Sequence, residues 1–414
     1  MLKDIVQGQK DLAATKFQKL LVVGIDTIFV ASSAKKAGYK VYAADYFGDL
    51  DLRKTCDDFI AVVEQQKGKS CGRIAQNFKP EAFLEMAKTL KKRHNIDGIL
   101  LSSGLEDFFD VLYELNSVAP IIGNSLRAIR NVREKLRFFE ELRALGIPHP
   151  ETIIVKSARE AEDAASEIGY PVVIKPAKGF GGAGIRKALN RDDLKKVLPT
   201  VFEDSGNIVI QKFINGVHAS ISLLAAENGV RVLSINEQLL GLPLVFQQEP
   251  FGYCGNIVPL KVSSSVFEKC KLTAEKVALY FGLRGSNGID IVLSEGEPYV
   301  MEVNPRFQGT LGCVERVLGI NLIESHIRAC LHGELPKIRE PSKFCARLIL
   351  YAPRRVFAPD LTAFQEVWDV PLPDSIIEEG EPLCSILAEG ESRDSSFQKA
   401  SSLAELIYSR LRKA

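Results

Sequence analysis

The sequence predicts an α/β region followed by an α+β region. Strand and helix patterns alternate over the first 125 residues, as they do when helices connect parallel strands. From about residue 150 to 320, short β-rich runs mix with helices and with hairpin turn sequences. With 414 residues the chain exceeds the usual size of one hydrophobic core, so we expect two or three packed lobes with short linkers.

The N-terminal region opens with a βαβ unit. Residues 19–24 read as a buried strand, an apolar helix pattern runs to Lys36, and a second strand covers 39–45. Further strands are expected at 97–101 and 121–123, with helices at 81–94 and after Gly104, so we predict a parallel sheet. Asp45 lies about where a dinucleotide site has its acid, but the required glycines after Gly24 are missing. We therefore expect a lobe that is Rossmann-like in fold only and does not bind NAD or FAD.

The second region begins after a helix at 132–145 and a strand at 152–155. Helices are then expected at 158–168, 191–202 and 267–281. The last eighty residues carry a strand at 346–351 and a closing amphipathic helix from about residue 402, and they form a small β-rich and helical region without recognisable chemistry.

Composition and charge are those of an ordinary globular enzyme. The 53 Lys and Arg residues nearly balance the 52 Asp and Glu residues, so we expect no nucleic acid or membrane partner. No apolar stretch could span a bilayer and the first twenty residues are too charged for a signal peptide, which favours a cytoplasmic protein. The eight cysteines lack zinc-binding spacing, so we expect reduced and mostly buried thiols.

A glycine-rich loop follows the strand at 172–176. Its glycines leave backbone N–H groups free to bind phosphate oxygens, and Lys175 at the end of the strand could reach the same phosphates. No G-K-[ST] follows, so a β-hairpin lid fits better than a P-loop. Taken alone, a flexible surface turn explains the loop equally well. The glycines are Gly179, Gly181, Gly182 and Gly184.

A predicted hairpin centred on Gly296 gives the strongest signal. It places Asp290 opposite Glu302, and two facing carboxylates repel each other unless a divalent cation bridges them. The two-residue period of a strand puts Asn304 and Arg306 on the same face as Glu302. Oxygen ligands suit Mg²⁺, and a guanidinium suits a transferring phosphoryl group. The alternative, an exposed polar hairpin face, is disfavoured by the apolar surroundings.

A third, weaker signal is the strand and polar hinge at 209–216. Backbone groups there could bind the edge of an adenine, with Gln211 or Lys212 beside it. Lys135, in the preceding helix, would by itself be an ordinary solvated lysine.

Taken in chain order, these features resemble the ATP-grasp superfamily over roughly residues 125–330, and the whole chain resembles its archaeal-type predicted ATP-dependent carboligases, which are related to biotin carboxylase. The resemblance implies a two-lobed ATP-grasp fold after the Rossmann-like lobe. It implies a pre-ATP-grasp domain at 1–125, an ATP-grasp domain at 126–335 with its lid at about 150–215, and an accessory region at 336–414. The matching segments are Lys135, residues 146–150, 173–176, 179–184 and 211–216, Asp290 and residues 301–306.

The resemblance also implies residue roles. Lys135 and Lys175 would contact the phosphates of ATP, the glycine loop would close over them, and Arg306 would steady an acyl phosphate, so that Arg306 and Lys175 are the catalytic candidates. Two further sets follow: Gln211, Lys212, Phe213 and Ile214 for adenine, and Asp290, Glu302 and Asn304 for Mg²⁺ or Mn²⁺. The chain departs from the family in having His218 where an acid usually holds the ribose, although a neutral imidazole can also hydrogen-bond a hydroxyl.

The expected reaction is an ATP-dependent, ADP-forming ligation. A carboxylate substrate would be phosphorylated to an acyl phosphate, and an amine, thiol or similar nucleophile would then displace phosphate. A bicarbonate-dependent carboxylase and a non-catalytic ATP-binding protein are the alternatives. The substrates and the oligomeric state, a homodimer included, stay open, and residues 102–106, 237–238 and 253–256 are candidates for selecting the substrate.

Overall fold

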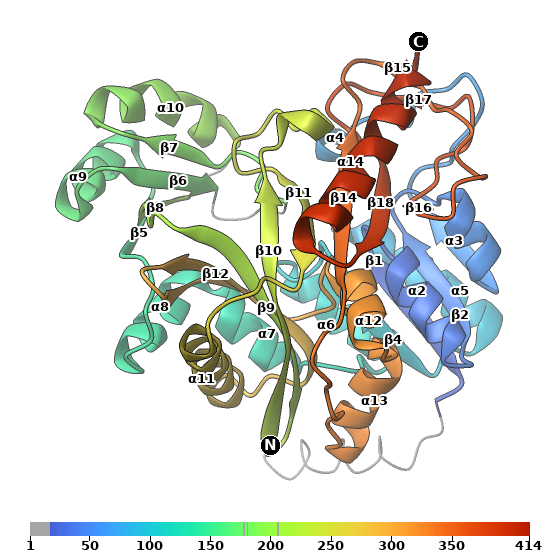
Figure 1. Cartoon of the computed structure of the whole chain (residues 1–414), viewed down its shortest axis with the longest axis horizontal. Coiled ribbons are helices and arrows are strands. Elements are labelled where there is room, and N and C mark those ends of the chain that lie inside the picture. Colours follow the sequence, from blue (N-terminus) through green and yellow to red (C-terminus); the bar gives the residue numbers. More distant parts are fainter. Residues whose placement is uncertain (1–16, 177–178, 180, 205–206) are drawn as a thin grey trace.

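The computed structural model describes residues 17–176, 179, 181–204 and 207–414, and these residues form a mixed α/β molecule with four sheets (Figure 1). No helix in the described ranges is long and apolar enough to cross a membrane.

The N-terminal lobe is a parallel sheet in the order β3-β2-β1-β4, as predicted. The predicted strand at 121–123 is wrong: only Ile121 forms an isolated bridge with Ile99, since Pro120 has no N–H to donate and Gly123 turns the chain at φ +145°. The elements of this lobe are β1 (Lys19–Gly24), α2 (Ile28–Lys36), β2 (Lys40–Asp45), α3 (Leu50–Thr55), β3 (Asp58–Ala61), α4 (Ile74–Asn77), α5 (Pro80–His94), β4 (Gly98–Leu101) and α6 (Phe109–Val118).

Two helices, not one, connect this lobe to the next. The single helix expected at 132–145 is replaced by α7 (Leu126–Arg133) and α8 (Lys135–Ala144). The chain leaves the helical conformation at Glu134, with ψ at 87°. Lys135 is consequently the first residue of a new helix.

A second four-stranded sheet is antiparallel and has the order β5-β8-β6-β7. Helix α9 packs against it through a face of small side chains that includes Ala161, Ala164 and Ala165. Strands β6 and β7 form the predicted hairpin around the glycine-rich loop, in which Phe180 lies outside the described residues. The elements are β5 (Thr152–Val155), α9 (Ala158–Ile168), β6 (Val172–Pro176), β7 (Arg186–Ala188), α10 (Arg191–Asp204) and β8 (Ile208–Lys212).

The central sheet is antiparallel and has the order β13-β12-β9-β10-β11-β14-β18-β16. Strands β14, β16 and β18 of the C-terminal region continue it. Its elements are β9 (Val217–Ala226), β10 (Gly229–Leu240), a 3₁₀ turn (Pro243–Val245), β11 (Tyr253–Val258), α11 (Ser264–Tyr280), β12 (Gly285–Ser294), β13 (Glu297–Asn304), α12 (Leu311–Leu318), α13 (Leu322–His332), β14 (Phe344–Tyr351), β16 (Val367–Trp368) and β18 (Pro382–Gly390).

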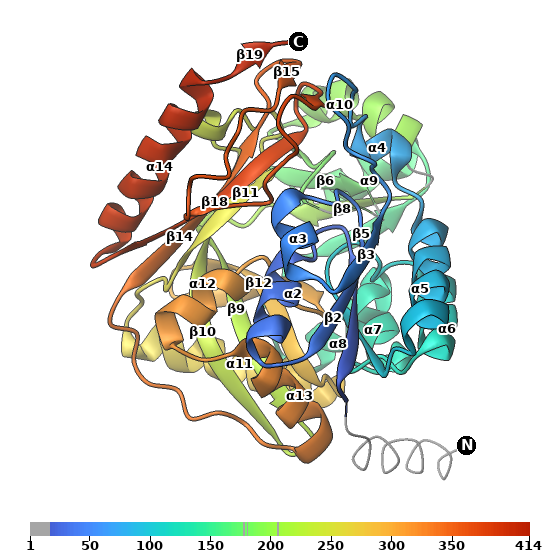
Figure 2. The ribbon, with the colours of Figure 1, turned by 90° about the vertical axis from the view of Figure 1, so that its right-hand side faces the viewer.

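Helices α2, α12 and α13 lie side by side and join the N-terminal lobe to the central sheet (Figure 2). A three-stranded sheet of β15 (Val356–Phe357), β17 (Ile376–Ile377) and β19 (Arg412–Lys413) and the helix α14 (Arg393–Ser409) complete the C-terminal region. Helix α14 begins earlier than predicted because Ser392 forms a capping box with Ser395. The N-terminal lobe and the central sheet share one hydrophobic core, whereas the small antiparallel sheet has its own.

Candidate nucleotide site

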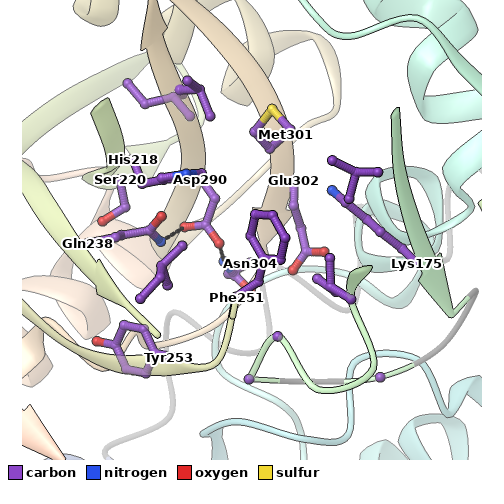
Figure 3. Close-up of a pocket in the computed structure, with 18 of the residues that line it drawn as sticks. Lys175, His218, Ser220, Gln238, Phe251, Tyr253, Asp290, Met301, Glu302 and Asn304 are labelled. Atoms are coloured by element: carbon purple, nitrogen blue, oxygen red, sulfur yellow. Dashed lines mark hydrogen bonds between the residues drawn. The ribbon is translucent and has the colours of Figure 1, made fainter. Parts of the chain in front are cut away.

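A cavity of about 270 Å³ lies between the small antiparallel sheet and the central sheet. Lys175 of β6 enters it from one side, and Asp290 and Glu302 of the β12–β13 hairpin enter it from the other (Figure 3). Glu106 of the N-terminal lobe also lines it. Three parts of the chain that are distant in sequence thus meet at one cleft.

Asp290 lies opposite Glu302 in the β12–β13 hairpin, as predicted, but the hairpin is not centred on Gly296: Ser294 pairs with Glu297, and a β-bulge between Asp290 and Ile291 shifts the register by one residue. The turn consists of Glu295 and Gly296, both with positive φ, which lets a two-residue loop connect the twisted strands. The two carboxylates are therefore neighbours across the strand pair, and the feature that the sequence predicted most specifically is present.

Asp290 is an acid that the protein surrounds with neutral hydrogen-bond donors. The amide nitrogen of Gln238 donates to Oδ1 at 2.9 Å, and that of Asn304 donates to Oδ2 at 3.0 Å. Burial, followed by repulsion from Glu302, raises the pKa of Asp290 to about 7. A cation bound between the two acids would relieve this cost.

Glu302 is held in its charged form by cations. Burial by itself raises the pKa of Glu302, but Arg133, Lys135 and Lys175 outweigh it and bring the pKa to about 2. Nη1 of Arg133 lies 3.1 Å from the carboxylate of Glu302, and the same guanidinium donates two hydrogen bonds of 2.7 Å to Asp107. The sequence analysis missed Arg133, since nothing in its helical pattern marks it as a buried residue beside residue 302.

The two predicted phosphate-binding lysines both line the cavity. Burial lowers the pKa of Lys175 to about 8, with a further contribution from the nearby Lys135, and burial also lowers the pKa of Lys135. Among the described residues, neither ammonium group lies within 4.0 Å of a carboxylate. The ion pairs in this part of the chain are formed by other basic residues. Two unpaired ammonium groups in one cleft fit an anionic ligand such as a triphosphate.

Arg306 is fixed by three hydrogen bonds. Its Nε donates to Oε1 of Glu106 at 2.8 Å, Nη2 donates to Oδ1 of Asn304 at 3.2 Å, and Nη1 donates to the carbonyl of Phe307 at 2.9 Å. Glu106 also accepts the N–H of Gly104, and Arg306 and Arg133 overcome the effect of burial and lower its pKa. The N-terminal lobe therefore orients a predicted catalytic side chain, and sequence reasoning did not foresee the role of Glu106.

The predicted adenine-binding residues divide into two groups. Lys212, Phe213 and Ile214 line the cavity, as does His218, the residue predicted to lie beside the ribose. Gln211 does not: its amide nitrogen donates to the hydroxyl of Thr152, and its side chain borders a separate small cavity.

Two of the side chains that do line the cavity are constrained by their surroundings. The ammonium group of Lys212 donates to the carbonyls of residues 168–170, the nearest at 2.8 Å, so this part of the side chain is already engaged. Burial and the charge of Lys175 lower the pKa of His218, which leaves the imidazole neutral and able to hydrogen-bond a hydroxyl.

The glycine loop contacts the segment that leads into β11. The carbonyl of Gly181 accepts the N–H of Tyr253 at 2.9 Å, and the N–H of Gly184 donates to Glu249. Gly182 has φ +78°, and a Cβ there would lie 1.9 Å from the carbonyl oxygen of Phe251, so only glycine fits. Gly179, Gly181 and Gly182 line the cavity. Gly184 does not, and its N–H bonds to Glu249 instead.

This arrangement defines an ATP-binding domain of the ATP-grasp type, and comparison with known proteins agrees. Residues 132–310 match the family described as "ATP-grasp domain". Residues 132–310 therefore form an ATP-grasp domain, the domain of a superfamily whose enzymes, ligases and carboxylases among them, use ATP and Mg²⁺. The predicted resemblance to archaeal members is confirmed by "Uncharacterized protein MJ0776" from Methanocaldococcus jannaschii, which is 26% identical over 375 residues, or 90% of this chain and 88% of that protein.

Two solved structures share the fold. The biotin carboxylase domain dimer of 2-oxoglutarate carboxylase from Hydrogenobacter thermophilus, in complex with MgADP, ADP and bicarbonate, has a TM-score of 0.73 and 17% identity, with 97% of this chain and 91% of that chain covered. The L-amino acid ligase from Bacillus licheniformis has a TM-score of 0.67 and 17% identity, with 96% of this chain and 98% of that chain covered. At these identities the likeness concerns the fold.

The residues of the cleft fit ATP and Mg²⁺. The unpaired ammonium groups of Lys135 and Lys175 suit the phosphates, and the facing acids Asp290 and Glu302 supply the oxygen ligands that Mg²⁺ prefers. Asn304 already uses its amide oxygen to accept from Arg306, so it is the least available of the three predicted metal ligands.

Proposed function

We propose that this protein is an ADP-forming ligase that phosphorylates a carboxylate substrate with ATP and then joins the acyl group to an amine or a similar nucleophile. One observation supports this above all: two unpaired lysines and two facing acids border the same cavity, next to an arginine that the protein holds in place. A cleft of this kind can bind a metal–nucleotide complex and direct its terminal phosphate toward Arg306.

In this proposal Lys135 and Lys175 bind the oxygens of the triphosphate and neutralise part of its charge. Asp290, Glu302 and Asn304 hold Mg²⁺, which when bound shields the phosphate oxygens from an approaching anion. Gly179, Gly181 and Gly182 cover the phosphates and exclude water, with Gly184 anchoring the loop. Phe213 and Ile214 contact the base, and His218 contacts the ribose.

The chemistry proceeds in two displacements. A carboxylate oxygen of the substrate attacks the γ-phosphorus in line, the bond to the β-phosphate oxygen breaks, and ADP leaves with that electron pair. The nucleophile then attacks the carbonyl carbon of the acyl phosphate, and inorganic phosphate leaves while the amine loses a proton. Arg306 has five N–H groups and uses three within the protein, so two remain for the carboxylate and the phosphoryl oxygens.

The domain assignment belongs to this proposal. Residues 1–125 supply Glu106 and the substrate side of the cleft, residues 126–335 supply the nucleotide site, and residues 336–414 support the central sheet. The small sheet near 150–215 acts as the lid.

A bicarbonate-dependent carboxylase is the second candidate, because a structure with the same fold contains bicarbonate together with MgADP. In that case the first acceptor of the phosphoryl group would be bicarbonate. ADP release that depends on added bicarbonate and not on organic acids would favour this candidate.

The test is ADP release by the purified protein with Mg·ATP and a panel of carboxylates, each with and without amines. The Glu302→Gln variant serves as the background rate, since it loses an acid of the cleft and is expected to keep the fold. We expect at least one acid to raise ADP release far above that background. If no acid, bicarbonate included, does so, the proposed function is wrong.

A further inference from the structure

A group of uncharged polar side chains lines one end of the cavity. These are Ser220, Gln238, Tyr253, Gln308 and Thr310, and we call them the polar end. Figure 3 shows the three labelled members, Ser220, Gln238 and Tyr253, on the side of Asp290 that faces away from Lys175. The polar end is therefore separated from the phosphate-binding lysines by the pair of acids.

A buried hydrogen-bond network fixes the polar end in place. Asn236, which is fully buried, donates to the hydroxyls of Ser222 at 2.9 Å and Ser220 at 3.2 Å. The hydroxyl of Ser222 in turn contacts Oε1 of Gln308 at 3.0 Å and the hydroxyl of Thr310 at 2.9 Å. Because Oε1 of Gln308 is used inward, its amide N–H groups, which meet no acceptor within the described ranges, are left for a ligand.

Tyr253 presents a second free donor. Its hydroxyl oxygen accepts from the amide of Asn256 at 2.6 Å, and its own O–H meets no acceptor in the part of the chain that the structure describes. Burial raises the pKa of Tyr253 to about 12, so the hydroxyl keeps its proton at neutral pH. Gly309 leaves this hydroxyl accessible, since a Cβ at that position would lie 2.9 Å from it.

Among the described residues, no cation at this end of the cavity is left for a second negative charge. Arg306 is paired with Glu106, and Arg347 beneath Gly309 is paired with Asp26 at 2.8 Å. A second carboxylate or a phosphate on the substrate would instead approach Asp290, at a cost that grows as water is excluded.

We propose that the polar end binds the part of the acid substrate remote from its reacting carboxylate, and that this part carries uncharged hydroxyl or carboxamide groups. The substrate is then a hydroxylated or amidated monocarboxylate. Dicarboxylates, phosphorylated acids and plain alkyl acids are excluded as preferred substrates. This inference rests on the proposed function, because it names the class of acid that the ligase activates.

The test compares acids in matched pairs of three to six carbons, with hydroxylamine as the common nucleophile and hydroxamate and ADP as the products. Succinamate against succinate tests charge, and 3-hydroxybutyrate against butyrate tests hydrogen bonding. We expect the uncharged polar member of each pair to have the higher kcat/KM. Tyr253→Phe should reduce this preference by about tenfold, the effect of one lost hydrogen bond, without changing the affinity for ATP. Tyr113→Phe, the same change at an exposed position outside the cavity, is the control.

Each outcome is decisive. A preference for the dicarboxylate or the alkyl acid, equal rates within pairs, or turnover of none of these acids while other carboxylates are activated overturns the inference and leaves the proposed ligase standing. If neither these acids nor any other carboxylate stimulates ADP release, the proposed function falls, and the inference falls with it. An unchanged preference in Tyr253→Phe removes the polar end from substrate selection.

Discussion

Replacing Arg133 with methionine tests whether charges from the N-terminal lobe hold the strand that carries Glu302. The guanidinium is 3% exposed and donates two hydrogen bonds of 2.7 Å to Asp107, whose side chain is 13% exposed. It also lies 3.1 Å from Glu302, which is 38% exposed. Methionine has a similar length and no charge, so the change removes the cation and leaves two acids behind.

The expected cost follows from these exposures. Removing one partner of a buried ion pair costs about 3–5 kcal/mol, because the other charge stays buried without compensation. Glu302 is partly solvated and still has Lys135 and Lys175 nearby, so most of the loss comes from Asp107. We therefore expect the lower end of that range, about 3 kcal/mol.

Urea unfolding followed by circular dichroism measures this loss. The control is Arg130→Met on the same helix, where Arg130 is 56% exposed and lies 3.8 Å from Glu134. An exposed pair of this kind contributes at most about 1 kcal/mol. If Arg133→Met were no more destabilising than Arg130→Met, the ion pairs around Asp107 would not hold the strand, and the reasoning would be refuted.

Three further predictions concern the cleft and the core. Glu302→Gln should abolish ADP release and leave the circular dichroism spectrum close to wild type, although it lowers the urea midpoint because three cations lose a partner; normal turnover would disprove the metal assignment. Lys175→Ala should weaken ATP binding at least tenfold in calorimetry, because it removes one of two unpaired cations, and an unchanged affinity would take Lys175 out of the site. Burial lowers the pKa of His326 to about 4 from 6.5, so between these values only the unfolded chain binds the proton. Stability should therefore fall by about 1.4 kcal/mol per unit as the pH drops from 6.5 toward 4, and His326→Gln should lose this component of the pH dependence.

The facing acids were predicted from a hairpin pattern, and the two-residue period of a strand decides which side chains share a face. The turn by itself would pair Asp290 with Met301, and a β-bulge beside Asp290, which the sequence does not reveal, brings Asp290 opposite Glu302. The parallel N-terminal sheet was predictable for a similar reason, since alternating strand and helix patterns permit few topologies.

The supporting contacts could not be predicted, because they join residues that are far apart in the sequence. Glu106 reaches Arg306 across 200 positions, and Arg133 meets Glu302 only because α7 ends against β13. The side chain of Gln211 was assigned to the adenine site because it lies near the hinge, yet it is buried against Thr152. In each case tertiary packing, and not a local pattern, decides the partner.

The distribution of charge explains why the proposed ligand is the metal–nucleotide complex and not either part alone. Arg133 and Arg306 are paired with acids of the N-terminal lobe and Lys212 donates to backbone carbonyls, so among the described residues of the cavity Lys135 and Lys175 are the cations left for phosphate. A triphosphate without a divalent cation would satisfy these lysines but add negative charge beside Asp290 and Glu302, which already repel each other. A divalent cation alone would relieve the acids and leave the lysines beside an extra positive charge. Only the metal–nucleotide complex balances both the two lysines and the two acids. The site depends on this complex because acids of the N-terminal lobe already pair with the two arginines.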